Sequence, residues 1–453
     1  MGSKWANKSL KELGVQLIDC VHKTPSAQTH GIPYIGIPQM KNGELDFEAS
    51  PRLISEADYK LWTEKVNPQR GDIVLSRRCN PGETAYVSDN TKFALGQNLV
   101  LLRTTGNLIK PEYLRWVVNS TYWWNEVEKY KNPGAIFDSL KCCDIPNFKI
   151  PAPPLHIQDK ISYILGSLTD KINLNNKYNH TLEKMSQTLF KSWFVDFDPV
   201  IDNALDAGNP IPEALQSRAE LRQKVRNSAD FKPLPAEIRS LFPSEFEETE
   251  LGWVPKTWTI SNLGKEFNIT MGQSPSGSTY NEDRVGLPFF QGKTDFGFRF
   301  PSERIYCTDP KRVANKLDTL LSVRAPVGVT NLASTECIIG RGLAALRHKS
   351  GNIAFTYYSV SNLSDYFSVF NGEGTVFGSI NQKDLKQLPL ICSPTELINK
   401  FEELSGKWEE KIFLHCGEIE NLSKLRDTLL PKLISGELSL EDLPDLTTDT
   451  EAA

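Results

Sequence analysis

Short apolar runs between turn residues fill two stretches of the chain and predict β-strands there. Examples are Ile73-Val74-Leu75, Leu99-Val100-Leu101-Leu102 and Leu343-Ala344-Ala345-Leu346, each bounded by Gly, Pro, Asn or Asp. Runs of this length between such residues are typical of buried strands. A helix is expected from Pro111 through Val118, because proline at a helix start costs no hydrogen bond. Both stretches are therefore predicted to fold as α+β domains.

Two other segments show the alternating four-three spacing of a coiled-coil seam. The first seam comprises Ile161, Leu165, Leu168, Ile172, Asn175, Asn179, Leu182, Ser186, Leu189 and Trp193. The second, less regular, comprises Leu397, Phe401, Leu404, Trp408, Ile412, Ile419, Leu422, Leu425 and Leu429. We expect the two helices to pair antiparallel, and two separate amphipathic surface helices are the alternative. Asn175 and Asn179 would fix the register of the seam at some cost in stability.

The strand-rich stretches are related by an internal duplication. Gly31-Ile32-Pro33-Tyr34-Ile35 recurs 255 residues later as Gly286-Leu287-Pro288-Phe289-Phe290, and Asp72 with its following strand recurs 246 residues later at Asp318. Gly96 to Arg103 matches Gly340 to Arg347 at an offset of 244, and Gly134-Ala135-Ile136-Phe137 matches Gly374-Thr375-Val376-Phe377 at 240. Four matches in the same order indicate two diverged copies, and a proline-rich exit into a long helix follows each copy. The predicted architecture is pseudo-twofold: two α+β copies separated by two long helices that form an antiparallel coiled coil.

These patterns divide the chain into six parts. They are a first globular domain (1–150), a first long helix (151–198), a proline-rich, acidic, helix-poor connector (199–250), a second globular domain (251–390), a second long helix (391–436) and an acidic C-terminal tail (437–453).

The net charge of −5 hides a segregation of charge along the chain. Residues 1–150 carry +3 and residues 251–392 carry +4, whereas residues 151–250 carry −4 and residues 393–453 carry −8. Differences of this size also arise by random scatter. The functional interpretation is that the two basic domains bind a polyanion, whereas the acidic segments that follow them do not.

Catalytic and metal-binding motifs are missing from the sequence. There is no phosphate-binding G-x-x-x-x-G-K-[ST] loop, no G-x-G-x-x-G after a strand, and no Asn/Asp-Pro-Pro-aromatic loop of an amino-methyltransferase. The eight cysteines form no C-x-x-C pair, and no histidine lies near them at metal-ligand spacing, so we predict no metal site. The absence of a long apolar segment and of a signal-peptide core predicts a cytoplasmic protein with no membrane partner.

The chain resembles the specificity subunits of type I restriction-modification enzymes. The resemblance rests on the layout and on four phrases: Leu251-Gly252-Trp253-Val254-Pro255 opening the second copy, Ile150-Pro151-Ala152-Pro153-Pro154-Leu155, Lys191 to Pro199, and Arg426 to Leu438. It covers nearly the whole chain. The first copy lacks the Gly-Trp-Pro opening phrase, so its start is left open.

This resemblance implies a DNA-reading subunit without catalytic activity. Each copy would be a target-recognition domain for one half of an interrupted sequence in double-stranded DNA. The helices would dock two methyltransferase subunits, and two motor-nuclease subunits would join. S-adenosylmethionine, ATP and Mg would belong to those partners, with no cofactor on this chain. The alternative is an assembly scaffold that binds no DNA.

A DNA reader needs basic side chains for phosphates and amide or guanidinium groups for base edges. The candidates are Lys23, Gln28, Arg77, Arg78, Asn80, Gln273, Ser274, Tyr280, Lys293, Thr294, Arg299 and Arg324, although each is also an ordinary choice for a solvated surface. Trp123 and Trp124 could stack on bases, but we favour packing in the core. The residues expected to hold the helices and the partner subunits are Ile161, Leu165, Leu168, Ile172, Leu182, Leu189, Trp193, Leu404, Trp408, Leu422, Leu425 and Leu429.

Overall fold

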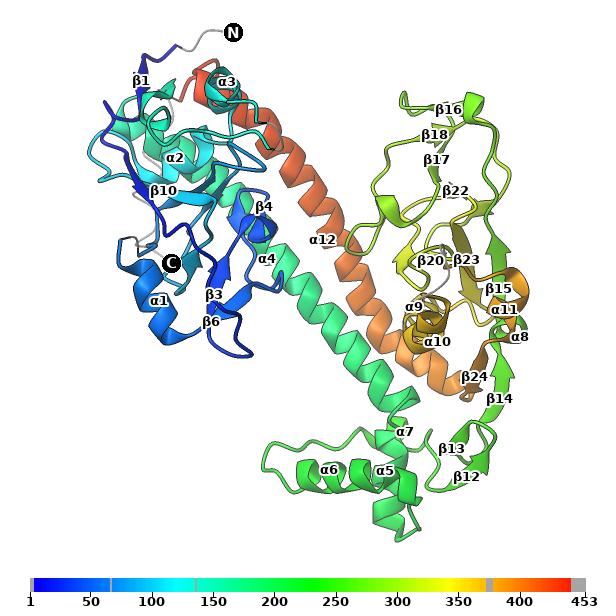
Figure 1. Cartoon of the computed structure of the whole chain (residues 1–453). Helices are drawn as coiled ribbons and strands as arrows, with labels where there is room; N and C mark the ends of the chain where they lie inside the picture. The colour runs from blue at the N-terminus through cyan, green and yellow to red at the C-terminus, as the bar shows by residue number, and fades with distance from the viewer. Residues whose placement is uncertain (1–3, 66, 135–136, 372–377, 441–453) are drawn as a thin grey trace. The chain divides into compact units, whose positions relative to one another are not determined.

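The computed structural model describes residues 4–65, 67–134, 137–371 and 378–440 (Figure 1). Contacts divide the chain into two compact units, Met1–Asn173 with Glu420–Ala453, and Leu174–Ile419. Each unit is considered by itself below. None of the helices in the described ranges is long and apolar enough to span a membrane.

The first globular copy is built on a six-stranded sheet. Its strand order is β2 (Gln16–Asp19), β10 (Leu99–Arg103), β7 (Ile73–Ser76), β8 (Thr84–Tyr86), β5 (Glu44–Leu45) and β4 (Met40–Lys41). A second sheet has the order β6 (Arg52–Ile54), β3 (Ile32–Ile35) and β9 (Ala94–Leu95), with β3 and β9 parallel. The helical elements are η1 (Ile37–Gln39), α1 (Glu56–Thr63), α2 (Pro111–Val117), α3 (Thr121–Tyr130) and η2 (Ile145–Asn147). The copy is closed by β1 (Asn7–Ser9), which pairs antiparallel with β11 (Lys149–Pro151).

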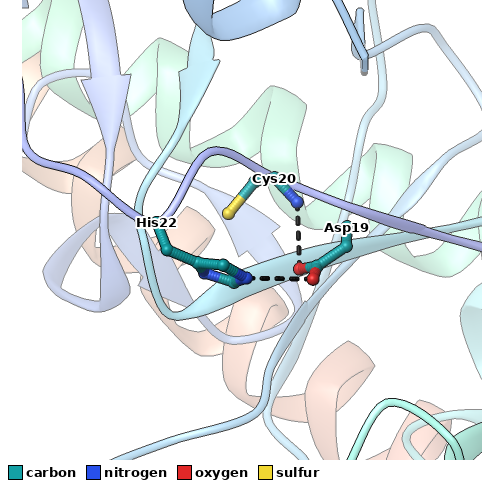
Figure 2. A group of neighbouring side chains, drawn as sticks. All are labelled: Asp19, Cys20 and His22. Atoms are coloured by element: carbon teal, nitrogen blue, oxygen red, sulfur yellow. Dashed lines mark hydrogen bonds and ion pairs between the residues drawn. The ribbon is translucent and has the colours of Figure 1, made fainter.

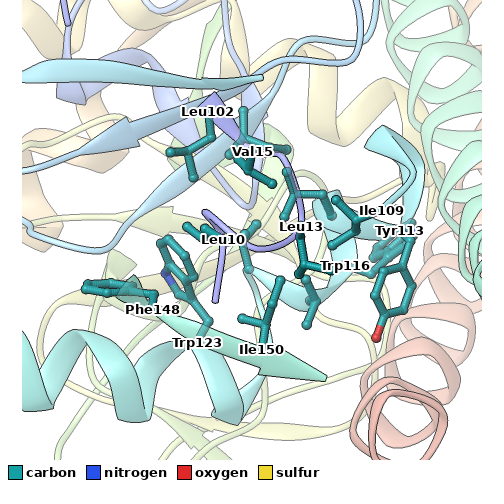
Figure 3. Close-up of a cluster of buried hydrophobic side chains, with 14 of the residues drawn as sticks. Leu10, Leu13, Val15, Leu102, Ile109, Tyr113, Trp116, Trp123, Phe148 and Ile150 are labelled. Atoms are coloured by element: carbon teal, nitrogen blue, oxygen red, sulfur yellow. The ribbon is translucent and has the colours of Figure 1, made fainter. Parts of the chain in front are cut away.

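The core of this copy lies between the sheet and α2 and α3. Figure 3 shows ten of its labelled side chains, among them Leu10, Leu102, Tyr113, Trp123 and Ile150, all buried. The Trp123 ring is fully buried and its Nε1 donates to Gly82 O at 2.8 Å. The core role predicted for Trp123 is confirmed, whereas Trp124 is 40% exposed.

The second copy repeats the central part of this topology. Its four-stranded sheet has the order β15 (Phe267–Met271), β23 (Leu343–His348), β20 (Thr319–Ser322) and β21 (Thr330–Leu332), which follows the order of β2, β10, β7 and β8. A five-stranded sheet has the order β16 (Tyr280–Asn281), β18 (Tyr306–Cys307), β17 (Leu287–Phe290), β22 (Cys337–Ile339) and β19 (Val313–Ala314), and a parallel pair recurs there in β17 and β22. The helical elements are α8 (Leu263–Glu266), η4 (Gly277–Thr279), η5 (Lys293–Asp295), α9 (Ile353–Ser361), α10 (Ser364–Ser368), η6 (Val369–Asn371) and α11 (Gln382–Gln387). It is closed by β14 (Thr259–Asn262) against β24 (Pro389–Cys392). The predicted duplication is thus confirmed in three dimensions.

The two long helices are α4 (Leu155–Phe194) and α12 (Thr395–Ser435). In the first unit, Ile161 and Leu165 of α4 share a core with Leu433 and Ile434 of α12. In the second unit, the other end of α4 packs near the start of α12, where Trp193 meets Phe401 with ring centroids 6.3 Å apart. The helices therefore run antiparallel, as predicted.

Most of the predicted seam positions are buried or half-buried. The buried ones are Ile161, Leu165, Ile172 and Trp193, and the half-buried ones are Leu168, Leu182, Leu189, Leu404, Trp408, Leu422 and Leu429. Leu425 was placed in the seam wrongly, since it is 47% exposed. The second seam departs from a strict heptad, and a straight α-helix rotates such positions away from the contact face.

The segment assigned as a helix-poor connector is helical, so that prediction is wrong. It contains α5 (Asp198–Ala207), η3 (Glu213–Leu215), α6 (Gln216–Arg226), α7 (Ala236–Arg239) and β12 (Phe246–Thr249). Strand β12 pairs with β13 (Gly252–Pro255), which lies just beyond the predicted end of the connector. Three aspartates four residues apart on α5 face three arginines with the same spacing on α6: Asp198 with Arg218, Asp202 with Arg222, and Asp206 with Arg226. These ion pairs join two short helices. The prolines mark the ends of the helices and do not prevent them from forming.

The predicted segment ends differ slightly from the observed ones. Positions 150 and 390 fall inside β11 and β24, because the closing strand of each copy includes the start of the proline-rich exit. The long helices begin after it, at Leu155 and Thr395. Most of the predicted acidic tail, part of the Gly134 repeat phrase and all of the Gly374 repeat phrase lie outside the described residues.

Candidate DNA interface

Three loops of the first copy meet at one edge of its main sheet. Strand β10 runs antiparallel to both β2 and β7, with Val100 opposite Asp19 and Leu99 opposite Ser76. The carboxyl ends of β2 and β7 therefore lie beside the start of β10. The loops that follow β2 and β7 and the loop that precedes β10 form what we call the reading edge of the first copy.

The second copy has the same edge. Strand β23 pairs antiparallel with β15 and β20, with Ala344 opposite Met271 and Leu343 opposite Ser322. The loops after β15 and β20 and the loop before β23 form its reading edge. Both edges thus follow from one strand arrangement.

Seven of the twelve predicted DNA-contacting residues lie in these loops. They are Lys23, Arg77, Arg78 and Asn80 in the first copy and Gln273, Ser274 and Arg324 in the second. All are exposed except Arg77 and Ser274, which are half-buried. The sequence named them from residue type alone, and the strand register places them together.

The loop after β7 is held by its own backbone and by polar side chains. Arg77 N donates to Asn98 O at 3.0 Å, which joins this loop to the one before β10. Asn80 Nδ2 donates to both carboxylate oxygens of Glu83 at 3.2 Å. This contact orients the Asn80 amide toward its own loop, so Asn80 must exchange a hydrogen bond in order to contact a base.

Figure 2 shows a compact polar group at the first reading edge, formed by Asp19, Cys20 and His22. His22 Nε2 lies 2.9 Å from Asp19 Oδ2, and its Nδ1 lies 3.0 Å from Gln97 O. The Cys20 thiol donates to Gly96 O, and burial raises its pKa to about 11. His22 and Cys20 thereby fasten the loop after β2 to the loop before β10.

This group corrects the expectation that no histidine lies near a cysteine at ligand spacing. The candidate ligand atoms of Asp19, Cys20 and His22 lie within 4.8 Å of one another. Each residue is nevertheless engaged in a hydrogen bond within the protein, and a protonated thiol is a poor metal ligand. The arrangement fits a structural fastening, and we assign no metal to it.

At the second reading edge, the sequence missed two residues. Ser274 Oγ donates to Gln291 Oε1 at 3.0 Å and accepts from Arg341 N at 3.2 Å. Gln291 and Arg341 are both exposed. Arg341 occupies the repeat position of Gln97, so the duplicated phrases Gly96 to Arg103 and Gly340 to Arg347 carried the signal that locates this loop.

Four predicted residues lie away from the reading edges. Gln28 is exposed and its N donates to Leu53 O at 2.9 Å beside the smaller sheet. Tyr280 stacks on Phe289 with ring centroids 4.6 Å apart. Lys293 and Thr294 are exposed in η5. A role for these four in DNA binding stays a prediction.

The assignment of Arg299 as a DNA contact is wrong. Its side chain is fully buried, with Nη2 3.1 Å from Glu183 Oε1 on α4 and Nε 3.4 Å from Glu409 Oε2 on α12. The guanidinium carbon lies 4.1 Å from the ring centroid of Tyr357. Arg299 thus binds the second copy to both long helices within its unit and faces no solvent.

Residues 2–184 match the family model described as the type I restriction modification DNA specificity domain. The same range contains the first copy, its closing strand and most of α4. Over these residues, the chain is similar to the DNA specificity domain of type I restriction-modification systems.

Curated relatives extend this similarity over most of the chain. The MjaX specificity subunit of Methanocaldococcus jannaschii is 28% identical over 381 residues, covering 82% of this chain and 79% of the relative. The HindI specificity subunit of Haemophilus influenzae is 26% identical over 412 residues, covering 82% of this chain and 87% of the relative. A crystal structure of a type I restriction-modification system S subunit from M. genitalium matches the fold with a TM-score of 0.53 at 15% identity, covering 95% of this chain and 96% of that one.

The start of the first copy, left open by the sequence, is now defined by comparison with the second copy. Trp5, Ser9 and Leu10 correspond to Trp258, Asn262 and Leu263, each 253 residues later. Ser9 Oγ accepts from Glu12 N, and Asn262 Oδ1 accepts from Lys265 N in the same way. A tryptophan followed four and five residues later by a capping residue and leucine was the available signal.

Proposed function

We propose that this chain is the DNA-sequence-specificity subunit of a type I restriction-modification complex and carries out no reaction itself. Each globular copy reads one half of a split duplex target through its reading edge. The supporting observation is one strand arrangement used twice, with different side chains on the same loops. Gln97 faces solvent where the second copy has Arg341, and His22 lies in a loop whose counterpart carries Ser274.

Contacts of two kinds are required at each edge. Phosphate contacts supply affinity and register, and side chains on base edges supply sequence. The basic excesses of +3 and +4 are small, so we expect tight, specific binding only after partner subunits are bound.

The partners in this proposal are two methyltransferase subunits, which use S-adenosylmethionine, and two motor-nuclease subunits, which use ATP and Mg. The proposal places the complex in the cytoplasm. The paired long helices are the proposed docking frame. Replacing half-buried Leu168 and buried Ile172 with Asp puts charges into their contact face, where an unpaired charge costs several kcal/mol.

The docking proposal is tested by co-purification and by mass measurement of the assembled complex. We expect the Leu168→Asp, Ile172→Asp variant to lose the methyltransferase, while exposed Lys171→Asp retains it. Unchanged assembly of the double variant would refute docking through these helices.

The half-site proposal is tested by mapping methylated DNA in cells. Grafting a relative's segment 259–392, which runs from β14 to the closing strand β24, should rewrite one half of the target and leave the other half unchanged. A graft that rewrites both halves, or a continuous target, contradicts the proposal. An assembly scaffold would show no steep dependence of DNA affinity on salt.

The gap between the half-sites is proposed to follow from the helices. The 40 residues of α4 span roughly 60 Å at about 1.5 Å per residue. One turn of DNA is about 34–36 Å, so half-sites centred about one turn apart, with roughly half a dozen unread base pairs between them, fit within that length. Inserting one helical turn after Asn175, with its counterpart in α12, should change the gap alone.

A further inference from the structure

The two copies present an exposed arginine at the same backbone position of the reading edge. Arg78 forms an isolated bridge with Ser139, and Arg324 forms the same bridge with Ser379. The residue before each arginine is equivalent as well, since Leu140 N donates to Arg77 O at 2.8 Å and Ile380 N donates to Val323 O at 3.0 Å. The two loops therefore share one backbone path at this point.

Each loop is fixed to the strand that precedes it. Ser76 N donates to Glu83 O and Ser322 N donates to Val329 O, both at 2.8 Å. The hydroxyl of each serine donates back into its loop, from Ser76 to Arg78 O at 2.9 Å and from Ser322 to Pro326 O at 2.7 Å. Arg78 and Arg324 therefore lie on turns whose backbone is fixed by hydrogen bonds.

A helix covers the far side of each turn. Gly82 has φ +98, and a Cβ there would lie 2.7 Å from a Val127 methyl group on α3. Gly328 has φ +101, and a Cβ there would lie 2.7 Å from Cβ of Phe367 on α10. Only glycine permits this backbone conformation and this close packing, which holds both turns rigid.

Both guanidinium groups belong to exposed residues. Within the described ranges, neither Arg78 nor Arg324 makes an ion pair or a side-chain hydrogen bond. Other arginines of the copies are engaged inside the protein: Arg103 with Asp72, and Arg347 with Asp318. Two exposed cations on matching rigid turns fit an anionic ligand that both copies meet.

We propose that Arg78 and Arg324 each bind a backbone phosphate of DNA and set the position of their copy on its half-site. This inference rests on the proposed function. The surrounding loops differ between the copies, as copies that read different sequences require. An arginine that both copies share should bind a part of the DNA that both half-sites share. Every half-site offers the same sugar–phosphate backbone.

The test uses the full chain assembled with its methyltransferase. Arg78→Ala and Arg324→Ala should each weaken binding to target and non-target duplexes by the same factor, roughly tenfold, and lower the slope of log K against log salt by about 0.9. The methylated sequence should stay the same. Arg78→Lys should recover much of the affinity, because a phosphate accepts any nearby cation whereas a base edge needs the guanidinium fork.

Arg70→Ala is the matched control, since Arg70 is exposed before the start of β7, at the opposite end of that strand from Arg78. If Arg78→Ala and Arg324→Ala bind DNA with the same affinity and salt slope as Arg70→Ala, the proposed phosphate contacts are wrong. The proposed function is not affected by that result. A changed half-site in the methylation map would also overturn the phosphate contacts, in favour of base contacts. If the wild-type complex binds no DNA in a salt-dependent way, the proposed function fails as well.

Discussion

Arg103 binds both carboxylate oxygens of Asp72, with Nε 2.8 Å from Oδ1 and Nη2 2.7 Å from Oδ2. Asp72 Oδ2 also accepts from Gln69 N at 2.8 Å, so one buried carboxylate joins the turn before β7 to the end of β10. In the second copy, Arg347 Nε donates to Asp318 Oδ1 at 2.6 Å. The duplication therefore preserved an ionic brace at the sheet end opposite the reading edge.

Removing one member of this brace should loosen its own copy only. We expect Arg103→Ala to cost about 2 to 3 kcal/mol, below the usual range for a fully buried pair, because the Arg103 side chain is 28% exposed. Hydrogen exchange of β7 and β10 measures this locally, which matters since a chain with two units does not unfold in two states. The Arg103→Leu, Asp72→Asn double variant should recover part of the loss. Faster exchange in β20 and β23 would contradict a local brace.

Arg299→Met should destabilise the second unit without a direct effect on DNA contacts. The substitution leaves Glu409, only 8% exposed, facing Glu183 without a cation, and removal of one buried partner costs about 3–5 kcal/mol. The expected results are faster hydrogen exchange in α9 and an unchanged salt slope for DNA binding. Glu409→Gln in the same chain should restore part of the stability. A reduced salt slope with normal exchange would return Arg299 to the DNA interface.

Asn175→Leu should raise the stability of the helix pair and weaken the specification of its register. Asn175 is 1% exposed and donates to Glu418 Oε2 at 2.8 Å. A leucine would bury apolar surface instead, and half-buried Glu418 can turn to solvent. The measurements are the melting temperature and the homogeneity of the assembled complex. Exposed Asn176→Leu is the control, and a melting temperature that falls with Asn175→Leu contradicts the expectation.

His348 should make the second unit less stable below neutral pH. Burial lowers its pKa; nearby Glu266 opposes this shift and Lys349 adds to it. The ring lies edge-on to Phe267 and Phe355, with centroids 5.0 and 5.1 Å away. Because the folded protein resists protonation of this ring, stability is fully present above about 6.5 and falls as the pH drops toward the lowered value.

The expected slope for His348 is below about 1.4 kcal/mol per pH unit, the limit for one proton. Thermal melts of the wild type, His348→Gln and the exposed-site control His30→Gln between pH 7.5 and 5 measure it. His348→Gln should flatten the dependence and His30→Gln should not. A slope that survives in His348→Gln assigns the effect to another group.

The sequence predicted the features that depend on local pattern. The strands, the long helices and the proline-rich exits follow from spacing within short windows. The antiparallel pairing was predicted because the helices hold equivalent places in a duplicated chain. Arg299 was misplaced because its partner Glu183 lies 116 residues away, and no local pattern distinguishes a buried guanidinium from an exposed one. The helices of the connector had a local signal that was missed: Asp198, Asp202 and Asp206 repeat every four residues, as do the arginines that face them.

The reading edges could be predicted from the sequence only in part. Residue type suggested Arg78 and Arg324, but their equivalence depends on strand register and on bridges to Ser139 and Ser379, which only the folded chain supplies. The same register places Gln291 and Arg341 beside Ser274.

The core of the first copy includes side chains from the far end of the chain. Leu433, Ile434 and Leu440 pack into it, Lys4 N donates to Ser435 O at 2.8 Å, and Lys160 Nζ donates to Leu440 O at 3.3 Å. A ribosome makes the first copy before these residues, which follow the whole second copy in the sequence. Until then the nascent chain exposes the apolar side chains of α4 that they will cover. A product that ends before Leu433 would keep that surface exposed and accessible to proteases.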